Sequence, residues 1–444
     1  MARSYHVWTI GCQMNEADSR RLAQQIEFLG YAHTADPEQA DLVILNTCVV
    51  KQQAEDRVYG RIGTLGAVKA RRPGMVIGLM GCMVGMKEAP ELRARFPYVD
   101  VFLSPSDTAP LLDFLQAGEM FEDPPAAPGA ALRASLPLPH TTRGTAVTAN
   151  VPVVLGCSHA CTFCVIPYRR GAERSRPMAD ILAEVRALAE QGVREVTLLG
   201  QIIDRYGVDF RDGTNLSGLL REVAKIDELL RIRFLTSHPN YMTDEMLETV
   251  AATDKICPHI EVAVQAGNNE VLERMRRGYT HEQFRDLVAR IRRIIPGVAI
   301  HTDVIVGFPG ETDEQFMDTH RLLADLRLDK VHLSRYSERP KTIAARNYRD
   351  DISEDEKQRR WQMIEDLQKG ILEEKNRSFF GKTVQVLVEE LQRGRWRGRT
   401  ERNNLVLFED VNDRRGQLVD VLVDWTGPFL LTGKPVEVAC TYHR

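Results

Sequence analysis

The feature that most constrains this chain is a group of three cysteines directly after an apolar run. Cys157, Cys161 and Cys164 have the spacing C-x-x-x-C-x-x-C, and the run Val151–Leu155 before them is typical of a β-strand. A loop this short can bring three thiolates to one metal centre, and thiolates suit iron–sulfur clusters or zinc. In a four-iron cluster, three cysteines would leave one iron open to a small molecule. The alternatives are a structural zinc site with His159 as the fourth ligand and three buried thiols without a metal.

Three further cysteines follow predicted strands in the first part of the chain. Cys12, Cys48 and Cys82 are each about one strand-and-helix unit apart, and Asn15 is expected to cap a helix that ends at Gly30. The strands predicted before these cysteines are Tyr5–Ile10, Asp41–Leu45 and Met75–Met80. Loops that follow parallel strands share one edge of a sheet, so the three thiols can converge on one site. The alternative is three separate buried thiols, because free cysteine packs as a small hydrophobe.

Length and composition predict three domains and a linker. A chain of 444 residues suits about three domains, and the Pro/Ala-rich residues 123–130 are typical of a linker. The expected boundaries are 1–120 for an N-terminal parallel α/β domain, 121–146 for the linker, 147–378 for a partial (β/α)6 TIM-like barrel and 379–444 for a small β-barrel. The strands predicted for the TIM-like barrel are Val151–Leu155, Glu195–Leu199, Ile232–Thr236, Ile260–Gln265, Ile300–Val306 and Val331–Arg335. The chemistry of such barrels lies at the C-terminal ends of the strands.

The C-terminal part combines a long helix with an all-β tail. Residues 353–378 predict one charged helix, and short strands are expected over 383–389, 404–408, 418–426 and 435–441. The segment 393–402 is expected to be a loop and holds five Arg, one Trp and one Glu. Because Arg pairs with phosphates and Trp stacks on bases, an RNA-binding surface is predicted. Its residues would be Arg393, Arg395, Trp396, Arg397 and Arg399. The alternative is a solvated charged surface.

The composition of the chain limits the binding partners and the cellular compartment that can be expected. The chain has 58 basic and 62 acidic residues, so a nucleic-acid site must be a local patch rather than a global field. No apolar stretch is long enough for a membrane span, and the first residues lack the apolar region of a signal peptide. Eight cysteines without an export signal predict a cytoplasmic protein that binds metal rather than forming disulfides.

These motifs together resemble the radical S-adenosylmethionine (SAM) methylthiotransferases, over nearly the whole chain. The stretches that carry the resemblance are 9–15, 46–48, 157–164, 167–171, 175–177, 264–268, 303–312 and 398–400. The resemblance implies that the tail is a TRAM domain, an RNA-binding β-barrel.

The resemblance also implies two [4Fe–4S] clusters with separate tasks. Cys157, Cys161 and Cys164 would hold the cluster that cleaves SAM to a 5′-deoxyadenosyl radical. Cys12, Cys48 and Cys82 would hold an auxiliary cluster that carries the sulfur to be installed. The SAM contacts expected from the resemblance are Phe163, between two ligands, and the strand-end residues Gln201, Ser237 and Gln265. Expected partners are a tRNA anticodon stem-loop and a low-potential electron donor, with neither DNA nor a membrane.

The family modifies three kinds of substrate. One group of members methylthiolates C2 of an isopentenylated adenosine at position 37 of tRNA, and the stretches 10–15 and 398–404 resemble that group. Alternatives are a threonylcarbamoyl-adenosine in tRNA and an aspartate of a ribosomal protein. The basic segment 393–402 argues against the ribosomal alternative, whose members usually have a more acidic tail.

Overall fold

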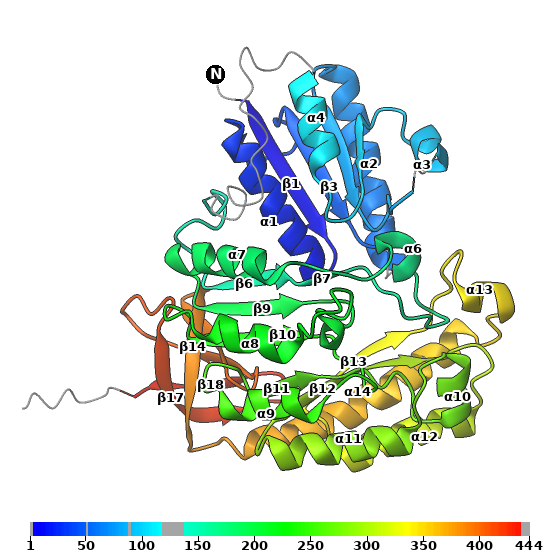
Figure 1. Ribbon diagram of the computed structural model, residues 1–444, viewed down its shortest axis with the longest axis vertical. Coiled ribbons are helices and arrows are strands. Elements are labelled where there is room, and N and C mark those ends of the chain that lie inside the picture. The colour runs from blue at the N-terminus through cyan, green and yellow to red at the C-terminus, as the bar shows by residue number, and fades with distance from the viewer. Residues whose placement is uncertain (1–2, 50–51, 88–89, 118–136, 437–444) are drawn as a thin grey trace, which may run out of the picture.

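The computed structural model describes residues 3–49, 52–87, 90–117 and 137–436, and the predicted linker segment 123–130 lies outside them. Figure 1 shows three parts: a layered N-terminal part, an open half-barrel of strands with helices outside, and a small barrel at one end of that half-barrel. Among the described residues, no helix is both long and apolar enough to cross a membrane.

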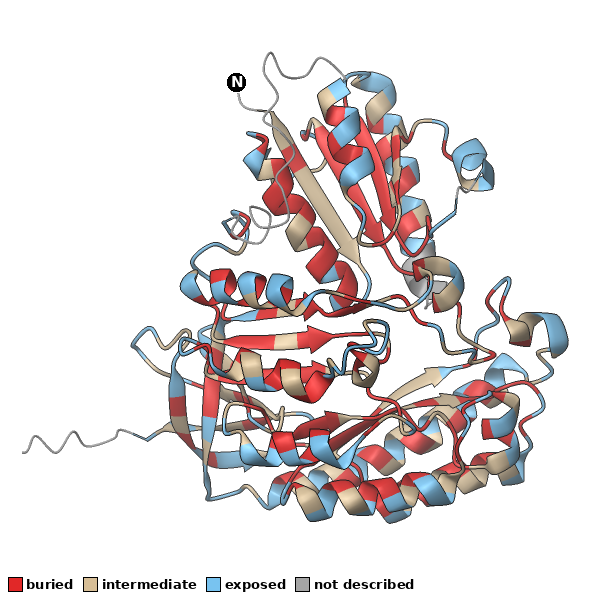
Figure 2. Ribbon diagram, viewed as in Figure 1, coloured by how far each residue is buried: buried red, intermediate tan, exposed pale blue. Residues whose placement is uncertain are grey.

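The N-terminal part is a five-stranded parallel sheet in the order β2-β1-β3-β4-β5. Its strands are β1 (Ser4–Ile10), β2 (Ala32–His33), β3 (Leu42–Thr47), β4 (Val76–Gly81) and β5 (Val101–Leu103). Its helices are α1 (Gln13–Phe28), α2 (Gln52–Arg71), α3 (Pro90–Arg95) and α4 (Ala109–Ala117). Alternate residues of β3 enter two separate cores, one with α1 and α4 and one with α2. This two-sided burial explains why the central strands are continuous apolar runs (Figure 2).

The middle part is a half-barrel of six parallel strands in two sheets, ordered β10-β9-β6 and β11-β12-β13. The strands are β6 (Thr148–Pro152), β9 (Glu195–Leu199), β10 (Arg231–Leu235), β11 (His259–Glu261), β12 (Ala299–Val306) and β13 (Lys330–Arg335). Single bridges such as Ser237 with Val262 join the two sheets. The α-helices are α6 (Ile166–Arg170), α7 (Met178–Glu190), α8 (Leu216–Ala224), α9 (Asp244–Ala252), α10 (Asn269–Arg274), α11 (His281–Ile294), α12 (Asp313–Leu326), α13 (Ile343–Asn347) and α14 (Glu354–Arg377), and η1 (Ile203–Arg205) is a 3₁₀ turn.

Two predictions near the cysteines were wrong in detail. The predicted strand Val151–Leu155 is two elements: β6, and then β7 (Val154–Leu155), which pairs antiparallel with β8 (Arg174–Ser175). After β7, Gly156, at φ +71°, turns the chain into the cysteine loop. In the N-terminal part, α1 begins directly after Cys12, so Asn15 lies inside the first turn rather than at the cap.

The C-terminal part is a closed five-stranded barrel in the order β14-β15-β16-β18-β17. Its strands are β14 (Thr383–Gln392), β15 (Arg395–Thr400), β16 (Leu405–Phe408), β17 (Leu418–Thr426) and β18 (Leu431–Pro435). The predicted loop 393–402 is wrong, because most of it forms β15 between β14 and β16. The strand β18 was not predicted at its observed bounds, and residues 437–441 of the predicted strand 435–441 lie outside the described part.

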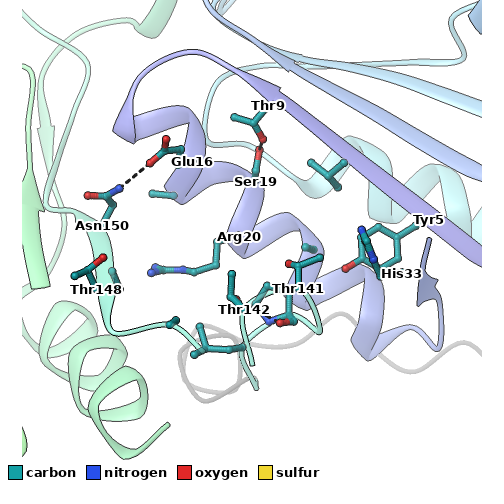
Figure 3. Close-up of a pocket in the computed structure, with 17 residues that line it drawn as sticks. Tyr5, Thr9, Glu16, Ser19, Arg20, His33, Thr141, Thr142, Thr148 and Asn150 are labelled. Atoms are coloured by element: carbon teal, nitrogen blue, oxygen red, sulfur yellow. Dashed lines mark hydrogen bonds between the residues drawn. The ribbon is translucent and has the colours of Figure 1, made fainter. Parts of the chain in front are cut away.

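One buried carboxylate holds the N-terminal part against the half-barrel. Glu184 of α7 forms ion pairs with Arg20 and Arg21 of α1 at 2.5 and 2.8 Å, and with Arg176 at 2.8 Å. These positive charges lower the pKa of Glu184 to about 2, although burial acts in the opposite direction. Figure 3 shows the cavity beside this contact, between α1 and the segment that enters β6. The sheet edge that carries the first three cysteines is therefore fixed against the half-barrel.

Candidate functional site

Backbone hydrogen bonds and one closely packed glycine hold the loop of Cys157, Cys161 and Cys164. The backbone N–H of Cys157 donates to the Gly171 carbonyl at 3.0 Å, and the N–H of His159 donates to Cys157 Sγ at 3.4 Å. A Cβ at Gly156 would lie 2.2 Å from the Ala172 carbonyl oxygen, so only glycine fits there. The chain is thereby held in a tight loop directly beyond β7.

A buried arginine lies against this loop. Arg277 donates to Cys161 Sγ at 3.1 Å, and Tyr279 and the Ala263 carbonyl fix its guanidinium from the other side. Burial, followed by the charge of the neighbouring Cys161, raises the pKa of Cys164 to about 12. Because the three thiols repel one another as thiolates, a metal centre together with Arg277 would stabilise the deprotonated loop.

Cys12, Cys48 and Cys82 lie at one edge of the N-terminal sheet, as predicted from their spacing. Cys48 and Cys82 are buried and continue the ladder: their N–H groups donate to the carbonyls of Ile10 and Thr47, each at 2.9 Å. Cys12 is exposed and lies just beyond β1. Burial raises the pKa of Cys82 most, and the charge of the nearby Cys12 raises that pKa as well. Three cysteines on adjacent strand ends suit one metal cluster.

Two asparagines from the cysteine motifs tie these strand ends together. Asn15 is fully buried, donates to Asn46 Oδ1 at 2.8 Å, and accepts from the N–H of Cys12 at 3.4 Å. Asn46 in turn donates to the Asn15 carbonyl at 2.8 Å and to Ser19 Oγ at 2.9 Å. Their role is therefore to position the loop of Cys12 over that of Cys48.

The short helix α6 connects the two cysteine groups. It begins two residues after Cys164 and ends at Arg170, whose buried side chain enters the N-terminal part and pairs with Asp18 at 3.4 Å. Arg170 also lies beside Cys82 and lowers the pKa of that thiol, against the larger effect of burial. One short helix and one buried side chain therefore link the two cysteine groups.

The strand-end residues expected from the sequence line the same end of the half-barrel as the cysteine loop. Gln201 and Ser237 follow β9 and β10, and Gln265 bridges to Val304 of β12. Gln265 has φ +72°, and within the described part of the chain its buried Oε1 has no hydrogen-bond partner. A strained residue with an unpartnered buried amide is consistent with a site for a polar ligand such as SAM. Phe163 packs partly against the barrel core, and its contact with SAM stays a prediction.

Two residues that the sequence did not single out as ligands lie beside the cysteine loop. Asp204 accepts from the backbone N–H of His238 at 2.6 Å, and burial raises the pKa of Asp204 to about 7. The His238 ring lies 4.6 Å from the ring of His159, and burial lowers the pKa of His238 to about 2. The site therefore contains a neutral imidazole and a carboxyl that titrates near neutrality.

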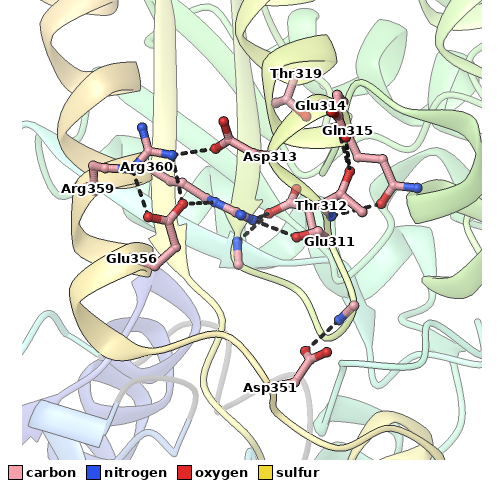
Figure 4. A network of polar contacts seen from close by, with 12 residues as sticks. Glu311, Thr312, Asp313, Glu314, Gln315, Thr319, Asp351, Glu356, Arg359 and Arg360 are labelled. Atoms are coloured by element: carbon pink, nitrogen blue, oxygen red, sulfur yellow. Dashed lines mark hydrogen bonds and ion pairs between the residues drawn. The ribbon is translucent and has the colours of Figure 1, made fainter.

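The motif 307–312 turns out to be a buried turn after β12 (Figure 4). Glu311 Oε2 accepts from the N–H of Gly307 at 2.7 Å and from Arg360 of α14 at 2.9 Å. Thr312 and Gln315 then form the capping box of α12. This motif is explained by the turn geometry at the C-terminal end of a barrel strand.

A cavity of about 980 Å³ brings the three parts of the molecule together. Cys12 and Gln13 line it from the N-terminal part, and Arg399 and Arg402 from the C-terminal barrel. Its wall from the half-barrel includes Glu261, His301, Asp303, Lys330, His332 and Ser334. A ligand held by the C-terminal barrel can therefore extend to the edge of the cysteine site.

Known proteins match the chain over its full length. Residues 4–104 match the Uncharacterized protein family UPF0004, 151–323 the Radical SAM superfamily and 377–436 the TRAM domain. A Roseiflexus relative named tRNA-2-methylthio-N(6)-dimethylallyladenosine synthase is 45% identical over 100% of this chain and 91% of its own. A relative of the same name from Chloroflexus aurantiacus is 43% identical over 98% of this chain and 91% of its own.

The chain belongs to the radical SAM methylthiotransferase family.

A solved structure shares the fold of this methylthiotransferase. The radical S-adenosylmethionine methyltransferase TsrM from Kitasatospora setae superposes with a TM-score of 0.57 at 17% identity, and the match covers 78% of this chain and 77% of that one.

The RNA surface predicted for this methylthiotransferase needs correction. Trp396 is only 4% exposed, belongs to the core of the C-terminal barrel and donates to the Asn412 carbonyl at 3.1 Å, so it cannot stack on a base. Arg397 pairs with Glu390 at 2.7 Å, so an acid outside the segment 393–402 offsets part of its positive charge. Arg399 lies 3.5 Å from Glu389 and faces the cavity, whereas Arg393 and Arg395 are exposed.

Proposed function

We propose that this enzyme methylthiolates C2 of N6-isopentenyladenosine at position 37 of tRNA. The observation that carries the proposal is the full-length similarity to relatives named for the synthesis of that nucleoside. The arrangement of the cysteine groups supports it, because α6 joins them at one site and a cavity leads from there to the C-terminal barrel. The alternative substrates, threonylcarbamoyl-adenosine and a ribosomal aspartate, have no comparable support.

Six cysteines are proposed to hold two [4Fe–4S] clusters. Cys157, Cys161 and Cys164 would form the SAM site, and Cys12, Cys48 and Cys82 the auxiliary site. When bound, the clusters and SAM supply a radical able to break an unactivated aromatic C–H bond and the sulfur that replaces the hydrogen. Donor type and spacing fit these groups, as does the unpartnered buried amide oxygen of Gln265.

The side chains of the protein would bind, orient and shield these groups. Arg277 and Arg170 each place a buried cation beside one cysteine group and offset its negative charge. Asn15 and Asn46 keep the auxiliary site at the mouth of the cavity. Gln201, Ser237 and Gln265 are proposed to contact SAM.

The C-terminal barrel is proposed to bind the anticodon stem-loop of the tRNA. Exposed Arg393 and Arg395 would contact phosphates, while Arg399 and Arg402 would guide a nucleotide into the cavity. The target adenosine must leave its stack to reach the cysteines, as enzymes that modify bases require. A low-potential electron donor in the cytoplasm completes the proposed reaction.

The proposed function is tested by nucleoside mass spectrometry of tRNA. A strain without the gene should lack 2-methylthio-N6-isopentenyladenosine, and the gene carried on a plasmid should restore it. Appearance of methylthiolated threonylcarbamoyl-adenosine instead would favour the alternative tRNA substrate. Unchanged tRNA with loss of a methylthiolated ribosomal protein would contradict a tRNA substrate altogether.

The cluster assignment predicts a definite iron content. Anaerobically reconstituted protein should hold ~8 iron and ~8 sulfide per chain, because each cysteine triad suits a four-iron cluster. Changing Cys157, Cys161 and Cys164 together to Ala should leave about half of the iron, measured by elemental analysis. Unchanged iron in this variant, or zinc in its place in the parent protein, would contradict the assignment.

The corrected RNA surface predicts a change in salt dependence. Arg393→Ala with Arg395→Ala should weaken tRNA binding and reduce the log–log salt slope by roughly 0.7 to 0.9 per lost phosphate contact. Binding is measured by filter retention across a salt series. Trp396→Phe, which keeps the barrel core filled, is the control and should leave the slope unchanged; equal slopes in all proteins would mean that these arginines are only a solvated surface.

A further inference from the structure

Three metal-ligating side chains meet inside the half-barrel, apart from the two cysteine groups. Glu261, His301 and His332 come from β11, β12 and β13, which lie side by side (Figure 1). One ligand atom from each lies within 4.8 Å of the other two. Glu261 and His301 are direct partners in the strand register, and all three residues line the cavity of about 980 Å³.

A third histidine, His259, holds His301 in an orientation suited to a metal ligand. His259 is buried behind His301, and its Nε2 lies 3.0 Å from His301 Nδ1. This contact occupies one ring nitrogen of His301 and leaves its Nε2 for a ligand. Metal-binding histidines almost always hydrogen-bond through their second ring nitrogen, usually to a carboxylate, a carbonyl or water. Here a second imidazole takes that place.

The other two groups already point toward each other. His332 Nε2 and Glu261 Oε2 are 3.5 Å apart, a separation that two ligands of one ion can share. Lys330 and Arg399 line the same cavity and oppose a cation, whereas Asp303 and Glu365 line it with negative charge. The charges around the three ligands are therefore mixed.

We propose that Glu261, His301 and His332 bind one divalent transition-metal ion, such as zinc or ferrous iron. Two imidazoles and one carboxylate are a common ligand set for these ions, and they leave further coordination positions open. Those positions face the cavity between the half-barrel and the C-terminal barrel, where water or an oxygen of a bound nucleotide completes the coordination. None of the three ligands belongs to a cysteine group, and metal binding here can be measured without the proposed reaction.

The test measures zinc binding to the reconstituted, cluster-loaded enzyme. The enzyme is dialysed anaerobically against Zn²⁺, and bound zinc and iron are counted together. One zinc per chain is expected with the iron unchanged. Glu261→Gln with His332→Ala should remove this zinc, whereas His140→Ala, at an exposed histidine outside the cavity, should retain it.

A change at His259, which lies behind His301, tests whether the outer hydrogen bond supports metal binding. His259→Asn should weaken zinc binding by roughly 10-fold, since loss of an outer hydrogen bond costs about 10- to 100-fold in affinity. The proposal is overturned if the parent enzyme retains no zinc, if its zinc survives Glu261→Gln with His332→Ala, or if zinc enters only as iron leaves. None of these outcomes depends on whether the enzyme modifies tRNA.

Discussion

Replacing Cys12, Cys48 and Cys82 together by Ala should abolish methylthio-adenosine formation while SAM cleavage continues. These residues lie on the N-terminal sheet, whereas Cys157, Cys161 and Cys164 lie in a loop of the half-barrel. If the N-terminal group carries the sulfur, its loss leaves no donor beside the base, but 5′-deoxyadenosine should still form. The measurement is one reaction with tRNA, SAM and a reductant, in which both products are quantified.

A matched control separates this outcome from a general loss of fold. Cys257 is also a buried thiol, and it belongs to neither group. Cys257→Ala should therefore keep both products. Methylthio product from a folded triple variant would refute the donor role. Loss of both products in a triple variant with normal circular dichroism and intact SAM-site iron would argue against separate tasks.

Glu184→Gln should destabilise the protein by roughly 3 kcal/mol or more, because it removes the buried charge that three arginines share. Arg20, Arg21 and Arg176 would keep their charges at the contact between α1 and α7. The effect is measured as a fall in the midpoint of thermal or urea unfolding at neutral pH. Earlier proteolysis between the N-terminal part and the half-barrel should accompany it.

The same carboxylate predicts how stability depends on pH. Its pKa is about 2 in the folded protein against 4.5 as the ordinary value, so its stabilisation is complete above about pH 4.5 and is lost as the pH falls toward 2. Glu184→Gln should flatten that part of the stability profile. Glu282, whose pKa is also lowered to about 2 but which is fully exposed, is the control, and Glu282→Gln should leave the unfolding midpoint nearly unchanged. Similar falls in the unfolding midpoint of both variants would show that the buried ion pairs of Glu184 contribute no more stability than an exposed carboxylate.

Local signals in the sequence were sufficient to predict most of the strands and helices that surround the site. The strand Glu195–Leu199 was predicted with its observed bounds, and the helices after Thr312 and Ser353 begin at capping residues visible in the sequence. The convergence of Cys12, Cys48 and Cys82 followed from the rule that parallel strands end at one edge.

Contacts between distant segments could not be predicted in this way. Arg170 pairs with Asp18 across two parts of the molecule, and no local pattern indicates which buried arginine meets which acid. Arg277 has no motif around it that marks a sulfur contact. The orientation of Trp396 was predictable, however: arginines at alternate positions 395, 397 and 399 have the period of a strand, which places residue 396 on the opposite face from them.

The helix α6 acts as a spacer of fixed length between the two cysteine groups. One residue inserted into it would turn everything beyond the insertion by about 100° and shift it by about 1.5 Å, which would withdraw Arg170 from Asp18. Surface loops usually tolerate changes in length, but this segment should not. The separation between the proposed SAM site and the proposed auxiliary site would thus be set by a number of residues. We expect relatives that share both cysteine groups to differ in the residues of this segment but not in how many it has.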